Sequence, residues 1–245
     1  MERKNGLNAL WVLLLFLAVA FCAEATERKE TIYKAYINGK MDVWKQVMTE
    51  LESESVRSPS EQLELLEYYY GYVGFLLGQD RTAQAKPYVK KGIEQIALLE
   101  KKRIQPATVL AYKGAFAGYS IALNKIKAVS LGPKSLAYLS EAIQKDPKNV
   151  QAMADYANAL FFAPAMFGGD RDMAVKLYLS AVKQLERNQK TTSNWFYLHS
   201  MTAVAHAYVE MGQLQQAKQM YQKILKFEPD FSWVRDELYP KLIEK

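Results

Sequence analysis

Residues 198–231, near the C-terminus, carry a regular hydrophobic spacing that few folds can satisfy. Apolar side chains recur there at intervals of three and four, with Gly212 between two such runs and Pro229 after the second. They are Leu198, Met201, Val204, Ala205, Tyr208, Ala217, Tyr221 and Ile224. This spacing places the apolar residues on one face of each run, so it predicts two consecutive amphipathic helices joined by a short turn.

The sizes of these residues indicate how the two helices pack. Ala205 and Ala217 are small enough to let the helices cross closely, whereas Met201, Tyr208 and Tyr221 are large enough to fill the space between neighbouring hairpins. Proline cannot continue a helix, because its ring clashes with the preceding turn and it lacks an N–H. A single hairpin cannot bury its own apolar face, so the pattern predicts a stack of hairpins.

Counted from Leu198, this pattern resembles the tetratricopeptide repeat (TPR). Met201 stands where the family has tryptophan and Ile224 where it has alanine, and both keep the position apolar. The same order of small and large residues recurs upstream, around Ala142, Ala157 and Ala181. The resemblance covers nearly all of residues 26–245, most specifically 198–231. It implies an all-α fold, a right-handed superhelical stack of about five TPR-like hairpins with a C-terminal capping helix, forming a single domain.

The helical pattern and its breaks give the expected boundaries. Strand-like alternation is nearly absent after residue 26, and Asn38-Gly39 reads as a turn between helices. The final segment carries Trp233, Leu238 and Leu242 at helical spacing, although Pro240 limits its regularity. The expected helix pairs cover residues 28–56, 60–103, 106–145, 149–188 and 192–227, followed by a capping helix over 231–244.

The first 25 residues have the composition of a secretory signal peptide. Arg3 and Lys4 precede the apolar run LWVLLLFLAVAFCA, and Ala23-Glu24-Ala25 forms a small-residue cleavage site. We therefore expect cleavage after Ala25 and an exported, periplasmic protein of bacterial origin. The alternative is that the segment remains uncleaved and anchors the chain.

Cysteine usage adds to this expectation. Cys22 is the single cysteine, and it lies inside the apolar run. Phe21 precedes it, where a lipoprotein signal has a small residue, which disfavours lipidation. Removal of this segment would leave a chain without disulfides or a thiol nucleophile, held together by its core alone.

The sequence contains no recognisable catalytic or metal-binding motif. His199 and His206 are seven residues apart, whereas helical metal pairs favour a spacing of three or four. There is no G-x-S-x-G sequence and no dinucleotide fingerprint. The net charge of +6 is spread over scattered lysines, which favours solvated helix faces over a nucleic-acid footprint. We therefore expect a non-enzymatic protein with no cofactor, no metal site and no nucleic-acid partner.

The stretch APAMFGGDRD at 163–172 needs a separate interpretation, because a Gly-Gly-Asp before a helix can resemble a phosphate loop. No strand precedes it and no Gly-Lys-Ser/Thr follows it. Asp170 is placed to cap the next helix by accepting from the N–H of Asp172 or Met173. The stretch is thus predicted to be an enlarged turn. An internal plug is the favoured role for Phe161, Phe162, Met166 and Phe167, and an exposed partner-binding patch is the alternative.

The TPR resemblance also implies which residues face a partner. In that family the second, fifth, ninth and twelfth positions of each first helix line a concave groove. Counting the third unit from Phe116 places Asn124 at its ninth position, matching Asn158 and His206 in the next two units. The candidate partner-binding residues are Asn124, Asn158, His199, Thr202, His206, Phe161 and Tyr70.

Two functional hypotheses follow. The first is a scaffold that binds a protein or peptide partner in the groove and reaches a membrane only through its partners. The alternative is an accessory subunit of an envelope transport system that binds a small apolar ligand or lipid. The small-residue run AYKGAFAGYSIA at 111–122 would allow helices to pack closely around such a ligand.

Overall fold

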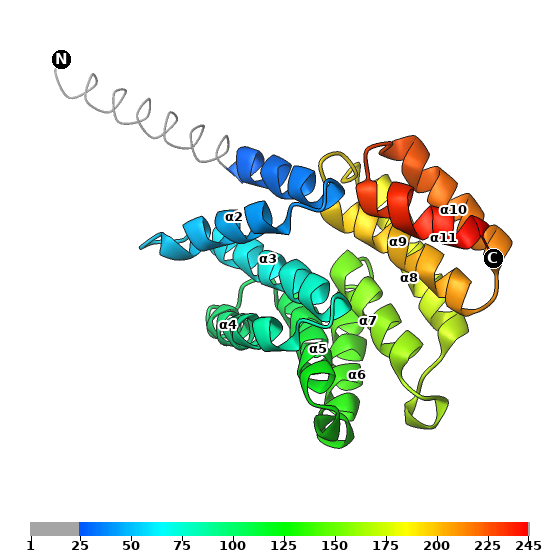
Figure 1. The fold of residues 1–245 in the computed structure, drawn as a ribbon. Helices are drawn as coiled ribbons and strands as arrows, with labels where there is room; N and C mark the ends of the chain where they lie inside the picture. Colours follow the sequence, from blue (N-terminus) through cyan, green and yellow to red (C-terminus); the bar gives the residue numbers. More distant parts are fainter. Residues whose placement is uncertain (1–24, 245) are drawn as a thin grey trace, which may run out of the picture.

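The computed structural model describes residues 25–244, and these residues are helical with short connections and no strands (Figure 1). Residues 1–24 of the predicted signal peptide lie outside the described residues. Within the described part, no helix is both long enough and apolar enough to cross a bilayer. The all-α fold class predicted from the hydrophobic spacing is therefore confirmed for residues 25–244.

The helices pair as the sequence predicts. Residues 25–37 are helical and precede α2 (Met41–Ser53). The next hairpins are α3 (Pro59–Gly78) with α4 (Thr82–Lys101), α5 (Pro106–Leu123) with α6 (Ala128–Lys145), α7 (Val150–Phe162) with α8 (Arg171–Arg187), and α9 (Trp195–Glu210) with α10 (Leu214–Phe227). A π-helical turn, η3 (Val234–Leu238), and α11 (Tyr239–Ile243) end the described chain. The stack thus has five hairpins and a short capping segment, irregular just before Pro240.

Small residues mark the closest helix crossings. Ala157 of α7 and Ala174 of α8 are fully buried, as are Ala205 of α9 and Ala217 of α10. Each pair belongs to one hairpin whose two helices pack along their length. A larger side chain at any of these positions would force the helix axes apart, because interiors are close-packed.

The third hairpin departs from the predicted repeat phase. A Cβ on Gly114 would lie 2.5 Å from Leu139 Cγ, and the Ser135 hydroxyl donates to the Gly114 carbonyl at 2.8 Å. Gly114 therefore marks the close crossing, and Phe116 does not begin the unit. The prediction that Asn124 faces the groove was wrong. Asn124 follows the last turn of α5, is exposed, and accepts a hydrogen bond from the Ile126 N–H at 3.1 Å.

The turn after α7 has the predicted capped form. The Asp170 carboxylate accepts from the Met173 N–H at 2.9 Å, so the N-terminus of α8 is already occupied by a side chain. Gly168 has a φ of +88°, and a Cβ on Gly169 would lie 1.9 Å from the Ala163 carbonyl oxygen. Both glycines are thus required by the backbone path of the turn, and the phosphate-loop interpretation has no support.

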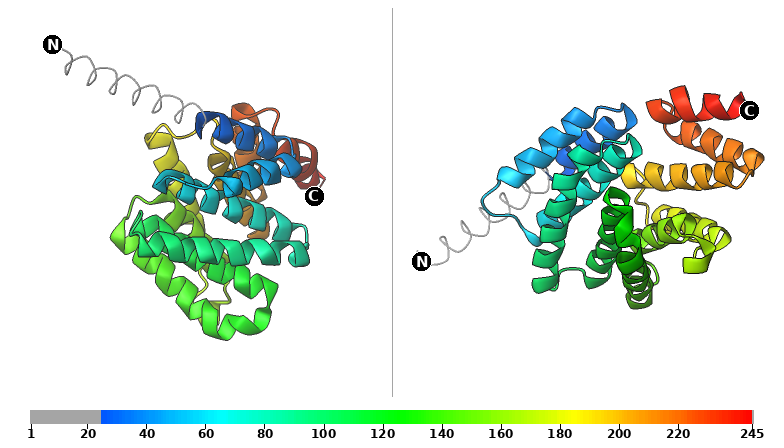
Figure 2. Two further views of the ribbon diagram at one scale, coloured as in Figure 1. Left: turned by 90° about the vertical axis from the view of Figure 1, so that its left-hand side faces the viewer. Right: turned by 60° about the horizontal axis from the view of Figure 1, so that its bottom comes forward.

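The two ends of the stack are in contact (Figure 2). The Tyr33 hydroxyl donates to Glu228 Oε2 at 2.6 Å, and the Ser232 hydroxyl donates to the Ile37 carbonyl at 2.8 Å. The Tyr36 ring lies 5.1 Å from the ring of Phe231. In a simple solenoid each repeat contacts only its neighbours. Here the first hairpin packs against the last one, so the stack closes on itself.

Candidate functional site

Helix α3 packs among the other first helices of the stack. Its Tyr70 is 2% exposed and donates from its hydroxyl to Asp155 Oδ1 on α7 at 2.8 Å. The Tyr70 ring lies 5.5 Å from Tyr112 of α5 and 6.4 Å from Phe196 of α9. The prediction that Tyr70 contacts a partner was therefore wrong. Its side chain joins four first helices of the stack and is sealed between them.

Two tryptophans complete the closure beside α3. Trp44 of α2 and Trp195 of α9 pack edge to face with centroids 5.0 Å apart. The Trp195 indole N–H donates to Glu67 Oε1 on α3 at 2.8 Å. A Cβ on Gly71 would lie 2.6 Å from Trp44 and 2.9 Å from Trp195, so only glycine permits this approach of α3. The two tryptophan rings therefore fill the space between α2, α3 and α9.

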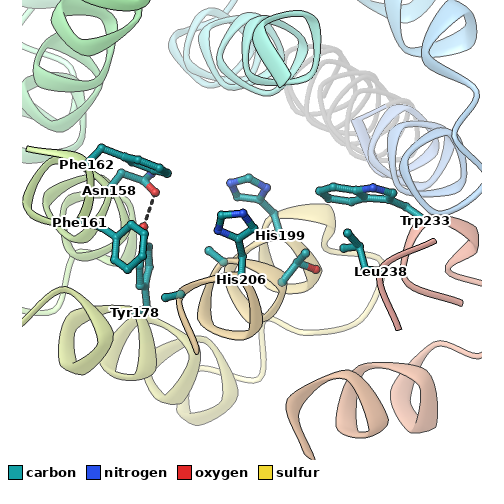
Figure 3. Close-up of a pocket in the computed structure, with 11 residues that line it drawn as sticks. Asn158, Phe161, Phe162, Tyr178, His199, His206, Trp233 and Leu238 are labelled. Atoms are coloured by element: carbon teal, nitrogen blue, oxygen red, sulfur yellow. Dashed lines mark hydrogen bonds between the residues drawn. The ribbon is translucent and has the colours of Figure 1, made fainter. Parts of the chain in front are cut away.

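A pocket remains beside this closed part, between α7, α8, α9 and the C-terminal segment (Figure 3). Its volume is about 190 Å³. Its lining residues are Asn158, Phe161, Phe162, Tyr178, His199, Thr202, Ala203, His206, Ala207, Trp233 and Leu238. Five of the seven candidate residues from the sequence converge here: Asn158, Phe161, His199, Thr202 and His206. Sequence reasoning did not include Tyr178 or the capping segment, and partner binding by the five residues stays a prediction.

The α7 wall of the pocket is aromatic. Phe161 is 3% exposed and lies beneath the Arg171 guanidinium, which is 5.0 Å from the ring centroid. Phe162 packs edge to face on Phe161 and remains 69% exposed. Asn158 accepts a hydrogen bond from the Tyr178 hydroxyl at 2.6 Å, which fixes its carboxamide at the pocket rim. The two wall residues Phe161 and Phe162 thus supply one buried ring and one accessible ring.

The predicted internal plug is wrong for three of its four residues. Phe161 is buried, but Phe162, Met166 and Phe167 are 69%, 83% and 62% exposed. The turn needs no plug, because Gly168 and Gly169 let its backbone fold tightly on the end of α7, with the Asp170 N–H bonded to the Leu160 carbonyl at 3.0 Å. The exposed-patch alternative therefore describes Met166 and Phe167, while Phe162 belongs to the pocket wall.

The α9 wall carries the polar groups. The Thr202 hydroxyl donates to the Leu198 carbonyl at 2.8 Å. Its hydrogen is therefore already used, and the methyl group is left for contact with a ligand. His206 is exposed. His199 is half-buried, with Nδ1 3.5 Å from the Tyr36 hydroxyl and its ring stacked on Phe196 at 6.0 Å. Burial lowers the pKa of His199 to about 4. The imidazole is thus neutral at pH 7, with one nitrogen able to donate and the other to accept.

This environment gives a measurable expectation for His199. Its imidazole should stay neutral from pH 8 down to about one unit above its pKa of about 4, because the buried site penalises the charged form. Long-range ¹H–¹⁵N spectra of the full chain would report the two histidines, and a His206→Gln variant would assign them. A His199 pKa near the ordinary value of 6.5 would show that water reaches the ring and that the pocket floor is open.

The polar side chains that line the pocket are Asn158, Tyr178, Thr202 and the two histidines. Among residues 25–244, no cluster of three histidine, cysteine or acidic side chains is arranged to hold a metal ion. Asp155 is a carboxyl group whose burial raises its pKa to about 7. However, it is 2% exposed and is held by Tyr70 and by Gln151, whose amide donates to Oδ2 at 2.7 Å. A substrate has no access to it, so its role lies within the fold.

Comparison with known proteins bears on the fold. No family model matches this sequence, and no curated protein matches it. Among solved structures, the chain is similar to a thermophilic TPR protein of Thermus thermophilus, with a TM-score of 0.50 and 16% identity. That match covers 94% of this chain and 97% of the other. A likeness at this level of identity speaks for the fold alone. Together with the five observed hairpins, it shows that this chain has the superhelical repeat fold of TPR proteins.

Proposed function

We propose that this chain is a non-enzymatic scaffold that binds a peptide segment of a partner protein in the pocket between α7, α9 and the C-terminal segment. One observation carries the proposal. Groove-facing residues of two successive first helices converge on this pocket, whereas the concave face beside α3 is closed by Tyr70, Trp44 and Trp195. The TPR fold supports it, because stacked repeats present concave surfaces that their proteins use for binding.

The chemistry of the walls indicates what would fit. Phe162 and Trp233 offer ring faces and edges to an apolar or aromatic side chain, and the buried Phe161 supports Phe162 from behind. His206 and His199 offer hydrogen bonds to the backbone beside that side chain. The charged residue nearest the aromatic wall, Arg171, lies over Phe161. We therefore expect an extended segment with one large apolar anchor residue, since such anchors dominate interface energetics.

The size of the pocket argues against the small-ligand alternative. Pockets for drug-sized ligands commonly enclose ~300–1,000 Å³. The volume here is about 190 Å³, which suits a single side chain. The run AYKGAFAGYSIA, which would have allowed a ligand cavity, instead packs α5 onto its neighbours. Gly114 meets Leu139, and Phe116 fills the space over Gly92.

Export remains part of the proposal. It rests on the charged start, the apolar run and the small-residue site before Thr26. Fractionation of cells that express the full chain, followed by N-terminal sequencing, would test it. Release into the periplasm with Thr26 as the first residue is the expected result, and retention of residue 1 on a membrane-bound product would establish the anchor instead.

Peptide binding can be tested without knowing the partner. A random peptide library would be selected on the full chain, and the affinities of the recovered peptides would be measured by calorimetry. Phe162→Ala and His206→Ala remove exposed pocket side chains and should each weaken binding by about thirtyfold or more, the loss typical of a hot spot. Both residues are exposed, so neither change should disturb folding.

Matched controls keep this test specific. Phe167→Ala removes a phenylalanine of similar exposure from the adjoining turn, and Asn124→Ala removes the candidate that lies away from the pocket. Neither should change the affinity. Peptides that bind equally well to Phe162→Ala and His206→Ala would overturn the proposed site, and selective loss with Phe167→Ala would move it to the turn.

A further inference from the structure

Two turns of the stack expose large apolar side chains that belong to neither the core nor the pocket. Ile126 lies just before α6 and Val129 in its first turn, and they are 86% and 87% exposed. Met166 and Phe167, in the 3₁₀ turn between α7 and α8, are 83% and 62% exposed. Their gathering in two turns of consecutive hairpins makes them candidates for contact with another surface. These four residues form the turn-tip surface.

Topology places both turns at the same end of the molecule. Each joins the two helices of its hairpin, the hairpins are consecutive, and their first helices α5 and α7 pack together. The turns protrude at the lower edge of Figure 1. A Cβ on Gly168 would lie 3.7 Å from Leu136 Cδ1, so the second turn rests against α6 of the preceding hairpin. The apolar tips therefore project from one end of the stack.

The first tip is flanked by positive charges, whereas Asp170 and Asp172 outnumber Arg171 beside the second tip. Residues 124–134 contain Lys125, Lys127 and Lys134, all exposed, and no acidic residue. Arg171 follows the second tip. Asp170 and Asp172 are the acidic residues beside the second tip, and the Asp170 carboxylate caps α8 by accepting from the Met173 N–H. Cations thus flank the first tip without any opposing carboxylate in the same segment.

We propose that the turn-tip surface docks on an anionic lipid surface. Interfacial anchors combine exposed apolar side chains, which enter the boundary between headgroups and acyl chains, with lysines that attract anionic lipids. Lys125 and Lys127 directly flank Ile126, which matches that arrangement. This assignment differs from the sequence-based expectation that the chain meets a membrane only through partners.

The test must separate the turn tips from the apolar residues 10–23, which could hold the full chain on vesicles by themselves. An environment-sensitive fluorophore would be attached at Met166→Cys in a Cys22→Ser background of the full chain. The matched control carries the same fluorophore at Val56→Cys, a position that is 85% exposed between α2 and α3. Vesicles of phosphatidylcholine alone and with about one-third phosphatidylglycerol would be titrated into each protein.

We expect a blue shift at position 166 on anionic vesicles and none at position 56. Lys125→Gln with Lys127→Gln should weaken the apparent affinity reported at 166 by roughly thirtyfold, about fivefold for each lost lysine. Equal shifts at both positions, or a shift unaffected by the lysine changes, would overturn the proposal. A shift at 166 that appears without vesicles and grows with protein concentration would overturn it in favour of a second copy of the chain.

Discussion

Replacing Trp195 by alanine is expected to lower the free energy of unfolding by about 4 kcal/mol, within the range for removing a buried tryptophan. Trp195 is 4% exposed and contacts Trp44, Tyr36 and Tyr70, which belong to three different helices. Its loss would leave a cavity that rigid neighbours cannot refill. It would also remove the donor to Glu67. Urea denaturation followed by circular dichroism would measure the change.

A second tryptophan provides the matched control. Trp233 lies on the pocket rim and is 39% exposed, so Trp233→Ala should cost less than about 1 kcal/mol. Similar losses of unfolding free energy for the two variants would contradict the packing described for Trp195, because they would show that it is no more tightly packed in solution than a rim residue. The first and last hairpins would then not be joined as described.

Replacing Asp155 by asparagine is expected to stabilise the fold at pH 8 and to have little effect at pH 4. Burial raises the pKa of Asp155 to about 7 in the folded chain, so the folded state binds a proton that the unfolded state releases near pH 4. Stability is therefore lost as the pH rises from about 4 to about 7, by at most about 4 kcal/mol. Asparagine carries no charge and avoids this loss.

The neighbours of Asp155 can accommodate the change. Asparagine keeps an oxygen for the Tyr70 hydroxyl, and the Gln151 carboxamide can turn to accept from the new amide. Glu67 and His199 are present in both proteins, so their titrations cancel in the difference between the two stability curves. Urea midpoints measured from pH 4 to pH 8 would give that difference. Curves that stay parallel across this range would show that Asp155 is ionised in the folded state.

Features that depend on short stretches of sequence were predictable here. The hairpin boundaries follow from spacing within each helix, and the Asp170 cap follows from an acceptor three residues before Met173. The small residues Ala205 and Ala217 identified the crossing in the last hairpin. Each of these is decided by contacts within one hairpin, which the order of residues encodes directly.

Features that depend on distant contacts were not predictable. Counting repeat positions puts Tyr70 in the groove. In the structure its hydroxyl donates a hydrogen bond to Asp155, 85 residues away, and the side chain is buried. The repeat period contains no signal that the first hairpin reaches Glu228, which is 195 residues from Tyr33. In the third hairpin the repeat positions counted from Phe116 do not match the structure. The crossing of α5 and α6 is identified by the approach of Leu139 to Gly114. The position of the pocket between α7, α8, α9 and the C-terminal segment depends on these long-range contacts, so the sequence alone could not predict it.

The closure of the stack is the claim on which the pocket assignment rests, and cross-linking tests it most directly. Tyr33→Cys and Glu228→Cys, in a Cys22→Ser background, would replace two long side chains whose tips meet at 2.6 Å by two short thiols that face each other across the space between them. A short bismaleimide should then join residues 33 and 228 within one folded chain, at a yield independent of protein concentration and lost in urea. Absence of this intramolecular product from the folded protein would show that the stack is open and that its groove is not restricted to the pocket.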